Sequence, residues 1–175
     1  ITSSVQALKR RGHEAAYFAR LPPEFAEEIR GMIAGVWLPI DVALAHYKTV
    51  DALPVSPIER VQMGEEVSHQ VQASVLATFA RAATNVGVTP WTGLSQFQRL
   101  WDRLMQGGAV CVTKVGPKEA RIEIVQLSLL DLPYFRTAFR GFIVGACQLF
   151  TKKVYGYDIA KLCSATTAGY RMAWV

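Results

Sequence analysis

The sequence predicts an α+β fold, with N-terminal helices packed on a small antiparallel sheet that belongs to a C-terminal β-β-α-β-β unit. Hydrophobic residues recur at helical spacing through most of residues 1–106. After Gly107-Gly108 the spacing changes to the alternation that is typical of strands. The strands of this second part form two pairs with one apolar helix between them, so we expect helices to cover one face of the sheet.

Length and composition predict one globular domain over residues 1–175, with a mainly helical part at 1–106 and the β-β-α-β-β part at 108–175. A chain of 175 residues can bury a sizeable core. Hydrophobic residues make up 51% and charged residues 19%, which excludes a disordered chain. The mean hydropathy of +0.18 is high for a solvated monomer and agrees equally with a buried interface, an apolar cavity or a large core.

Prolines and capping residues mark where the helices of the first part begin. The predicted helices lie at residues 5–20, in "PPEFAEEIRGMI", in "WLPIDVALAHYKTV" and in a long stretch at 56–84. Ser56 caps the long helix, Pro57 takes its first position and Glu59 completes a capping box. A further helix begins at Thr89-Pro90 and ends at Gly107-Gly108.

The second part has the alternation expected of strands. "AVCVTKV" and "ARIEIVQL" flank the turn "GPKE" and predict a hairpin with a four-residue connection. A helix follows from Asp131 and Pro133 to about Phe150, and strands at about 154–165 and 169–175 come after it. The last strand places three large side chains on one face: Tyr170, Met172 and Trp174.

The most apolar run, "RGFIVGACQLF" at residues 140–150, is too short to span a membrane. A spanning helix needs about 20 apolar residues, and Arg140 and Lys152-Lys153 bound this run. Gly141 and Gly145 within it have the small-xxx-small spacing that lets a second backbone or a flat ligand approach the helix. Close packing in the core is the commoner use of that spacing, and both alternatives stay open.

The distribution of charge and the cysteine content indicate which partners and which cellular compartment to expect. The net charge is +5, but the basic residues are scattered and the longest basic run is Lys9-Arg10-Arg11, so we predict no nucleic-acid binding. The cysteines are three in number and far apart, and no secretory signal precedes them. We therefore expect a cytoplasmic protein with reduced thiols.

No arrangement of residues predicts catalysis, a metal site or a particular cofactor. His13, His46 and His69 lie on three different predicted helices, and no pair has metal-ligand spacing. His69 is the best placed of them for a haem ligand, with a solvated helix histidine as the alternative. Cys111, Cys147 and Cys163 are expected to be small buried hydrophobes, unless the fold gathers them into a zinc or acyl-thiol site. The weak metal candidates are thus Cys163 and His69, and we expect a protein that is not an enzyme.

The stretch "YFRTAFRGFIVGACQLFTKKVYGYDIAKLCSATTAGYRMAWV" resembles the end of the 4-vinyl reductase domain. That domain is grouped with haem-NO-binding sensors and certain TRAPP trafficking subunits in one α+β superfamily. The resemblance covers residues 108–175 and depends on the G-xxx-G helix, on Cys163 and on the terminal aromatic Trp174, with Gly169 in the intervening turn. The chain is also similar to a paralogous family of uncharacterised myxobacterial proteins of about this length.

The chain departs from each of these patterns at a functional position. The second cysteine of the vinyl reductase pattern has no counterpart near Arg171-Met172, which argues against a metal. The Tyr-x-Ser-x-Arg motif of haem-NO sensors is absent, which argues against haem. No cysteine precedes Cys111, so the acylation site of TRAPP subunits is missing. The resemblance therefore implies a pocket or an interface between helices and sheet without naming its ligand.

These observations together predict a non-catalytic sensory or regulatory domain that binds an apolar small molecule. Its ligand-binding pocket is expected between helices and sheet, with five lining residues: Phe139, Phe142, Cys147, Trp101 and Trp174. The alternative is a protein-interaction module, a homodimer or a subunit of a larger assembly, that binds no ligand. The positive mean hydropathy supports that alternative.

Overall fold

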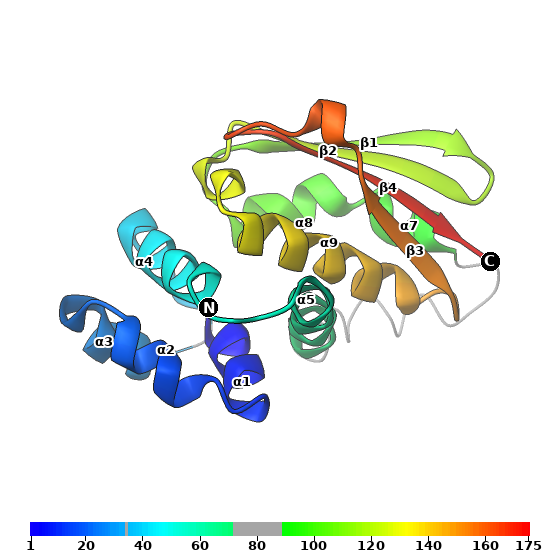
Figure 1. Cartoon of the computed structure of the whole chain (residues 1–175). Coiled ribbons are helices and arrows are strands. Elements are labelled where there is room, and N and C mark those ends of the chain that lie inside the picture. Colours follow the sequence, from blue (N-terminus) through cyan, green and yellow to red (C-terminus); the bar gives the residue numbers. More distant parts are fainter. Residues whose placement is uncertain (34, 72–88) are drawn as a thin grey trace.

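The protein consists of a group of N-terminal helices and an antiparallel sheet with a helix packed on one of its faces. The structure is a computed structural model and describes residues 1–33, 35–71 and 89–175. Figure 1 shows the N-terminal helices at one side of the molecule and the sheet at the other, with α9 between them. The helices of the first side are α1 (Thr2–Arg10), α2 (Glu14–Arg20), α3 (Pro23–Arg30), α4 (Ile40–Asp51) and α5 (Pro57–Val71).

The helix starts follow the sequence signals, with one difference near the N-terminus. The capping box is confirmed: the Ser56 N–H donates to Glu59 Oε2 at 2.9 Å, and the Glu59 N–H donates to Ser56 Oγ at 3.3 Å. Helix α5 is described as far as Val71, and the rest of the predicted long helix, 72–84, lies outside the described residues. The single helix predicted at 5–20 is wrong, because the backbone at Gly12 takes a φ of +74° and separates α1 from α2.

The segment from residue 90 to residue 108 contains two helices where the sequence predicts one. They are α7 (Pro90–Leu94) and α8 (Phe97–Leu104), with a break at Ser95-Gln96. Helix α8 ends at Leu104, three residues before the predicted stop, and the chain turns at Gly107-Gly108, whose φ values are +89° and +68°. Side chains of other types rarely adopt such angles, and this turn leads the chain directly into the sheet.

A four-stranded antiparallel sheet has the order β1-β2-β4-β3, which confirms the predicted α+β class. The strands are β1 (Ala109–Gly116), β2 (Glu119–Val125), β3 (Val154–Asp158) and β4 (Ala168–Trp174). The β1–β2 connection is shorter than predicted, because Gly116 already pairs with Glu119. Strand β3 also ends early, at Asp158, and a short 3-10 turn at Ala160–Leu162 follows it.

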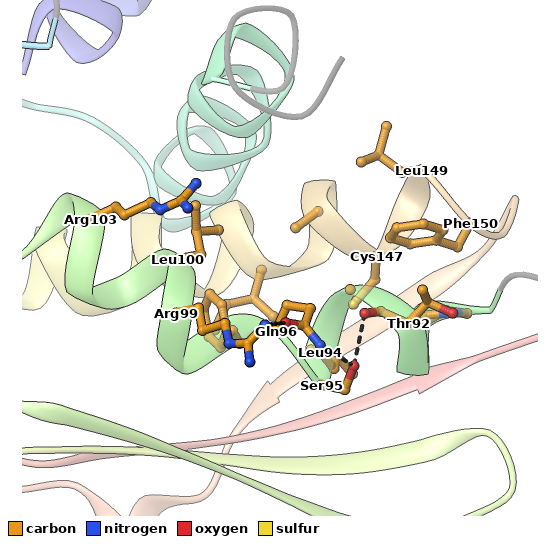
Figure 2. Close-up of a pocket in the computed structure, with 15 residues that line it drawn as sticks. Thr92, Leu94, Ser95, Gln96, Arg99, Leu100, Arg103, Cys147, Leu149 and Phe150 are labelled. Carbon is orange, nitrogen blue, oxygen red and sulfur yellow. Dashed lines mark hydrogen bonds between the residues drawn. The ribbon is translucent and has the colours of Figure 1, made fainter. Parts of the chain in front are cut away.

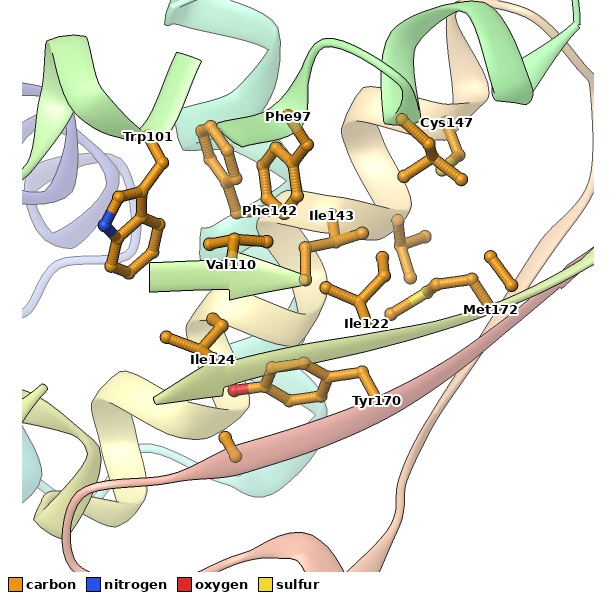
Figure 3. Packing of buried hydrophobic residues seen from close by; sticks show 14 of the residues in the cluster. Phe97, Trp101, Val110, Ile122, Ile124, Phe142, Ile143, Cys147, Tyr170 and Met172 are labelled. Atoms are coloured by element: carbon orange, nitrogen blue, oxygen red, sulfur yellow. The ribbon is translucent and has the colours of Figure 1, made fainter. Parts of the chain in front are cut away.

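Helix α9 (Pro133–Gln148) covers the inner face of this sheet (Figure 3). Ile143 of the helix and Ile122 and Met172 of the strands are fully buried against one another in the same hydrophobic cluster. The Tyr170 hydroxyl donates to the Arg136 carbonyl of α9 at 3.1 Å and links the last strand to the helix. The apolar run of the sequence is therefore mainly core, and no helix of the described residues is long and apolar enough to cross a membrane.

Glycines set the distance between α9 and α5. A Cβ on Gly141 would overlap the Val61 carbonyl of α5, and a Cβ on Gly64 would overlap the Ala138 carbonyl of α9. The two helix backbones are thus in direct contact at these points. Of the two alternatives for the G-xxx-G spacing, Gly141 serves helix packing.

Candidate functional site

A groove lies between the α7–α8 segment and the C-terminal half of α9, and we call it the α7–α9 groove (Figure 2). Its volume is about 490 Å³, within the range of small-molecule sites. On one side it is lined by Leu94, Phe97 and Leu100. On the other side it is lined by Ile143, Ala146, Cys147, Leu149 and Phe150.

The apolar character of the groove follows from the amphipathic pattern of its helices. In α8, Phe97 and Trp101 are buried while Gln98 and Asp102 are exposed, as expected for a surface helix. Val110 of β1 donates its N–H to Gln98 Oε1 at 2.7 Å and ties this helix to the sheet. The groove wall is therefore held by rigid elements on both sides.

Cys147 is the one predicted ligand-binding residue that lines the α7–α9 groove. Its side chain is buried, and burial raises the pKa of the thiol to about 12. At neutral pH the group is a protonated thiol. It contributes a polarisable, apolar surface to the groove. It does not act as a nucleophile, because the thiolate is the nucleophilic form.

The predicted residues Phe139, Phe142 and Trp101 form an aromatic cluster between α8 and α9. Phe139 lies at its centre, 5.5 Å from Phe142 in a stacked arrangement and 5.8 Å from Trp101 edge to face. Phe139 also stacks on Phe97, which lines the groove. Phe139 and Phe142 themselves line a second cavity of about 110 Å³, beside Tyr47, Met63 and Tyr134.

Trp174 lies apart from both cavities, against α7. Its ring meets Trp91 edge to face at 5.1 Å, and Trp91 Nε1 donates to the Pro117 carbonyl at 3.0 Å. Trp174 therefore fastens α7, which forms one end of the groove, to the sheet. The five predicted residues thus all belong to, or pack against, the hydrophobic cluster with the sheet. Of the five, Cys147 alone lines the α7–α9 groove.

Two groove residues that sequence reasoning missed are Arg99 and Arg103. Both line the groove and both are exposed. Figure 2 shows them toward one end of the groove, with Leu149 and Phe150 toward the other. The signal was present in the sequence as two arginines four residues apart on a strongly amphipathic helix, a spacing that places side chains on one helix face.

Neither of the weak metal candidates, His69 and Cys163, is among the described residues that line the groove. His69 is exposed on α5, and the Cys163 thiol donates to the Ile159 carbonyl at 3.5 Å. Cys111 is exposed on β1. Within the described parts of the chain, no group of three or more His, Cys, Asp or Glu side chains is placed to hold a metal ion.

His46 is buried in the N-terminal helical core and takes part in a hydrogen-bond chain. Its Nδ1 lies 2.8 Å from the Tyr17 hydroxyl, and its Nε2 lies 3.0 Å from Ser4 Oγ. Ser4 Oγ in turn lies 3.4 Å from the Tyr134 hydroxyl, which donates to Met63 Sδ at 3.9 Å. Burial lowers the pKa of His46 well below its usual value, so the ring is neutral.

Solved structures of H-NOX domains share this fold. The chain is similar to the Fe(II) unliganded H-NOX protein from K. algicida, with a TM-score of 0.72 and 8% identity over 99% of this chain and 94% of that one. It is similar to an oxygen-binding H-NOX domain related to soluble guanylate cyclases, with a TM-score of 0.66 and 11% identity over 98% and 91%. A structure described for the modulation of haem redox potential through protein-induced porphyrin distortion gives a TM-score of 0.67 at 11% identity, again over 98% and 91%.

These identities show a shared fold and no more. The haem-NO-binding part of the predicted resemblance is thereby confirmed for the fold, while the likeness to 4-vinyl reductase and TRAPP subunits stays a prediction. No protein-family model matches the chain, and no curated protein sequence matches it.

The side chains of this chain do not fit a haem in the groove. The sequence has three histidines: His46 has both ring nitrogens in hydrogen bonds, and neither His13 nor His69 is among the described residues that line the groove. The groove cysteine, Cys147, is packed into the hydrophobic cluster with the sheet and is only 2% exposed. Among the described residues, the groove therefore has no histidine to serve as an axial ligand, in agreement with the missing Tyr-x-Ser-x-Arg motif.

Proposed function

We propose that this protein is a non-catalytic sensory or regulatory domain that binds an apolar small molecule in the α7–α9 groove. The observation that carries the proposal is the groove itself: about 490 Å³ with walls of leucine, isoleucine and phenylalanine side chains. The fold shared with H-NOX domains, one of them oxygen-binding, supports a ligand-binding role. Haem is not the proposed ligand, because none of the described residues that line the groove is a histidine and the Tyr-x-Ser-x-Arg motif is absent from the sequence.

The predicted binding residues take different parts in this proposal. Cys147 contacts the ligand directly, since it lines the groove. Phe139 and Phe142 line the second cavity, and together with Trp101 they support Phe97 from beneath. Trp174 acts through Trp91 by holding α7 in place.

Filling the groove tests the proposal. We expect Ala146→Trp to lower the affinity for the neutral apolar dye Nile red at least tenfold, because the indole takes the space that the dye would occupy. Fluorescence titration of the native chain and of the variant measures the effect. Ala15→Trp, at an exposed position of α2, is the matched control and should bind as the native chain does. Equal dye binding by native chain and Ala146→Trp would show that the groove is not the site.

A cluster of exposed apolar side chains favours a second candidate function, the protein-interaction module. Ile33, Val36 and Trp37 between α3 and α4 are 74%, 60% and 51% exposed, and Ile40 follows at 54%. Exposed apolar side chains in a contiguous stretch are typical of interaction surfaces. Light scattering should then give a mass that rises with concentration, and Trp37→Ser should return it to the monomer mass. A monomer at every concentration would remove this candidate.

A further inference from the structure

We infer that the α7–α9 groove takes a single-chain amphiphile with an anionic headgroup, whose tail lies along the apolar walls and whose headgroup pairs with Arg99 and Arg103. This inference rests on the proposed function and specifies its ligand class. It depends on three observations: the two cations at the rim, the absence of an internal anion for them, and the unequal ends of the groove.

The two arginines form a cationic pair on one helix face. They are four residues apart on α8, so their side chains leave the helix on the same side. Both side chains line the groove and are exposed, and their aliphatic stems continue the apolar wall that Leu100 begins between them. A ligand tail in the groove would thus end next to guanidinium groups.

No carboxylate of the described residues neutralises this pair. Arg99 donates from Nη1 to the neutral Gln96 Oε1 at 3.1 Å, and no ion pair to either arginine is present in the described ranges. The neighbouring acid on α8, Asp102, accepts from Gln98 Nε2 at 2.7 Å. No aspartate or glutamate is among the described groove-lining residues.

Of the nine other arginines that the structure describes, six pair with a carboxylate, and the other three are Arg20, Arg30 and Arg136. Arg10 and Arg11 both contact Glu66, Arg60 contacts Asp51 at 2.8 Å and Arg171 contacts Glu119 at 2.7 Å. Two adjacent arginines without a carboxylate, at the rim of an apolar groove, are therefore complementary to an anion from outside. Guanidinium groups bind carboxylates with charge-assisted hydrogen bonds.

The opposite end of the groove has no charged side chain among its described lining residues, and Thr92 and Ser95 are the polar residues there (Figure 2). The ring of Phe150 lies on Gly93, where an added Cβ would come within 2.8 Å of a ring carbon. Leu149 lies beside it on the same wall. One uncharged end with Leu149 and Phe150 and one cationic end match a molecule with an apolar tail and an anionic head.

The test compares two ten-carbon probes that differ in headgroup, decanoate and 1-decanol, by displacement of Nile red from the full chain below their aggregation concentrations. We expect decanoate to bind the native chain at least tenfold more tightly than 1-decanol. In Arg99→Gln/Arg103→Gln this preference should fall to within about twofold while Nile red still binds, which also shows that the variant is folded. Arg20→Gln, an exposed arginine of α2 outside the groove, should keep the full preference.

The outcomes separate this inference from the function on which it rests. Nile red binding with equal affinity for the two probes would overturn the anionic headgroup and leave the apolar groove in place. An unchanged preference for decanoate in the double variant would overturn the assignment to these arginines. Decyl phosphate matching decanoate on the native chain, and losing its advantage in the double variant, would support the inference and extend it to phosphate headgroups. Failure of Nile red to bind at all would overturn both proposals.

Discussion

His46 shows at the scale of a single residue how a buried polar group shapes the stability of this fold. Its ring is fully buried between Tyr17 and Ser4, and each ring nitrogen has a hydroxyl partner. A neutral imidazole supplies one donor and one acceptor, which satisfies both contacts. An imidazolium would have two donors, and it would also lose its hydration in this core.

The free energy of unfolding should therefore fall as the pH drops below about 6.5. The folded pKa of His46 lies below the unfolded value, so the unfolded chain binds a proton that the folded chain does not. This contribution to the free energy of unfolding is fully present above the pKa that His46 has in the unfolded chain. Below that pKa it is lost by at most about 1.4 kcal/mol per pH unit. Urea denaturation between about pH 8 and pH 5 measures it.

Two variants make this pH dependence specific to His46. His46→Gln should flatten the slope below the histidine pKa, whereas His69→Gln, at an exposed position, should keep it. Glu59 and Glu66 have lowered pKa values through their hydrogen bonds to Ser56 and Arg11. Their contribution is lost only as the pH falls below the usual carboxyl range, so it does not overlap with the histidine window. A slope that persists in His46→Gln would disprove the assignment.

At the scale of elements, the contact between α5 and α9 depends on glycine. We expect Gly141→Ala to lower the free energy of unfolding by about 2–3 kcal/mol or more, because the new methyl group would overlap the Val61 backbone and force the helices apart. Chemical denaturation measures the loss. Gly31→Ala is the control, since its Cβ would meet only the Glu27 carbonyl at 3.4 Å, and it should change stability little. Equal stability of both variants would contradict the close contact.

Elements whose ends carry a local signal could be predicted from the sequence, and the others could not. The capping box at Ser56 acts through its own backbone, so its effect is visible in the sequence. Helix α8, in contrast, ends at Leu104 with an extended backbone at Met105, before the glycine pair that predicts its end. The break between α7 and α8 has no proline or glycine at Ser95-Gln96 and depends on packing. The early end of β3 at Asp158 likewise depends on tertiary structure, because the next residues show no strand breaker.

The candidate site was predictable in its region but not in its lining. Aromatic residues at helical spacing indicate an apolar interior, yet spacing does not show which of them face a cavity and which pack against each other. Cys147 faces the groove, while Phe139 lies at the centre of a packed cluster about two turns of α9 away. The role proposed for Arg99 and Arg103 depends on the lack of a carboxylate partner among the described residues. The sequence does not show this lack, because it depends on how the chain folds.

At the scale of the whole molecule, α9 joins two hydrophobic clusters. Tyr134 near its start belongs to the cluster of the N-terminal helices, and Ile143 farther along belongs to the cluster with the sheet. The Tyr134 N–H donates to Asp51 Oδ1 at 2.9 Å, and Arg60 of α5 pairs with the same carboxylate at 2.8 Å. Loss of either cluster would therefore release one end of α9 and weaken the packing of this helix in the other cluster.

The chain should accordingly unfold in one cooperative transition, as expected of a single domain over residues 1–175. Ile29→Val in the first cluster and Ile122→Val in the second make a matched pair, because each removes one methylene from a buried isoleucine. Each should lower the free energy of unfolding by about 0.5–1.5 kcal/mol. Each should also shift the whole transition, whether it is followed by far-UV circular dichroism or by tryptophan fluorescence. The fluorescence is followed in the Trp37→Ser chain, whose remaining tryptophans, Trp91, Trp101 and Trp174, lie in the sheet half. If Ile29→Val moved only the circular dichroism signal and left the tryptophan transition at the native midpoint, the two clusters would be separate folding units and α9 would not couple them.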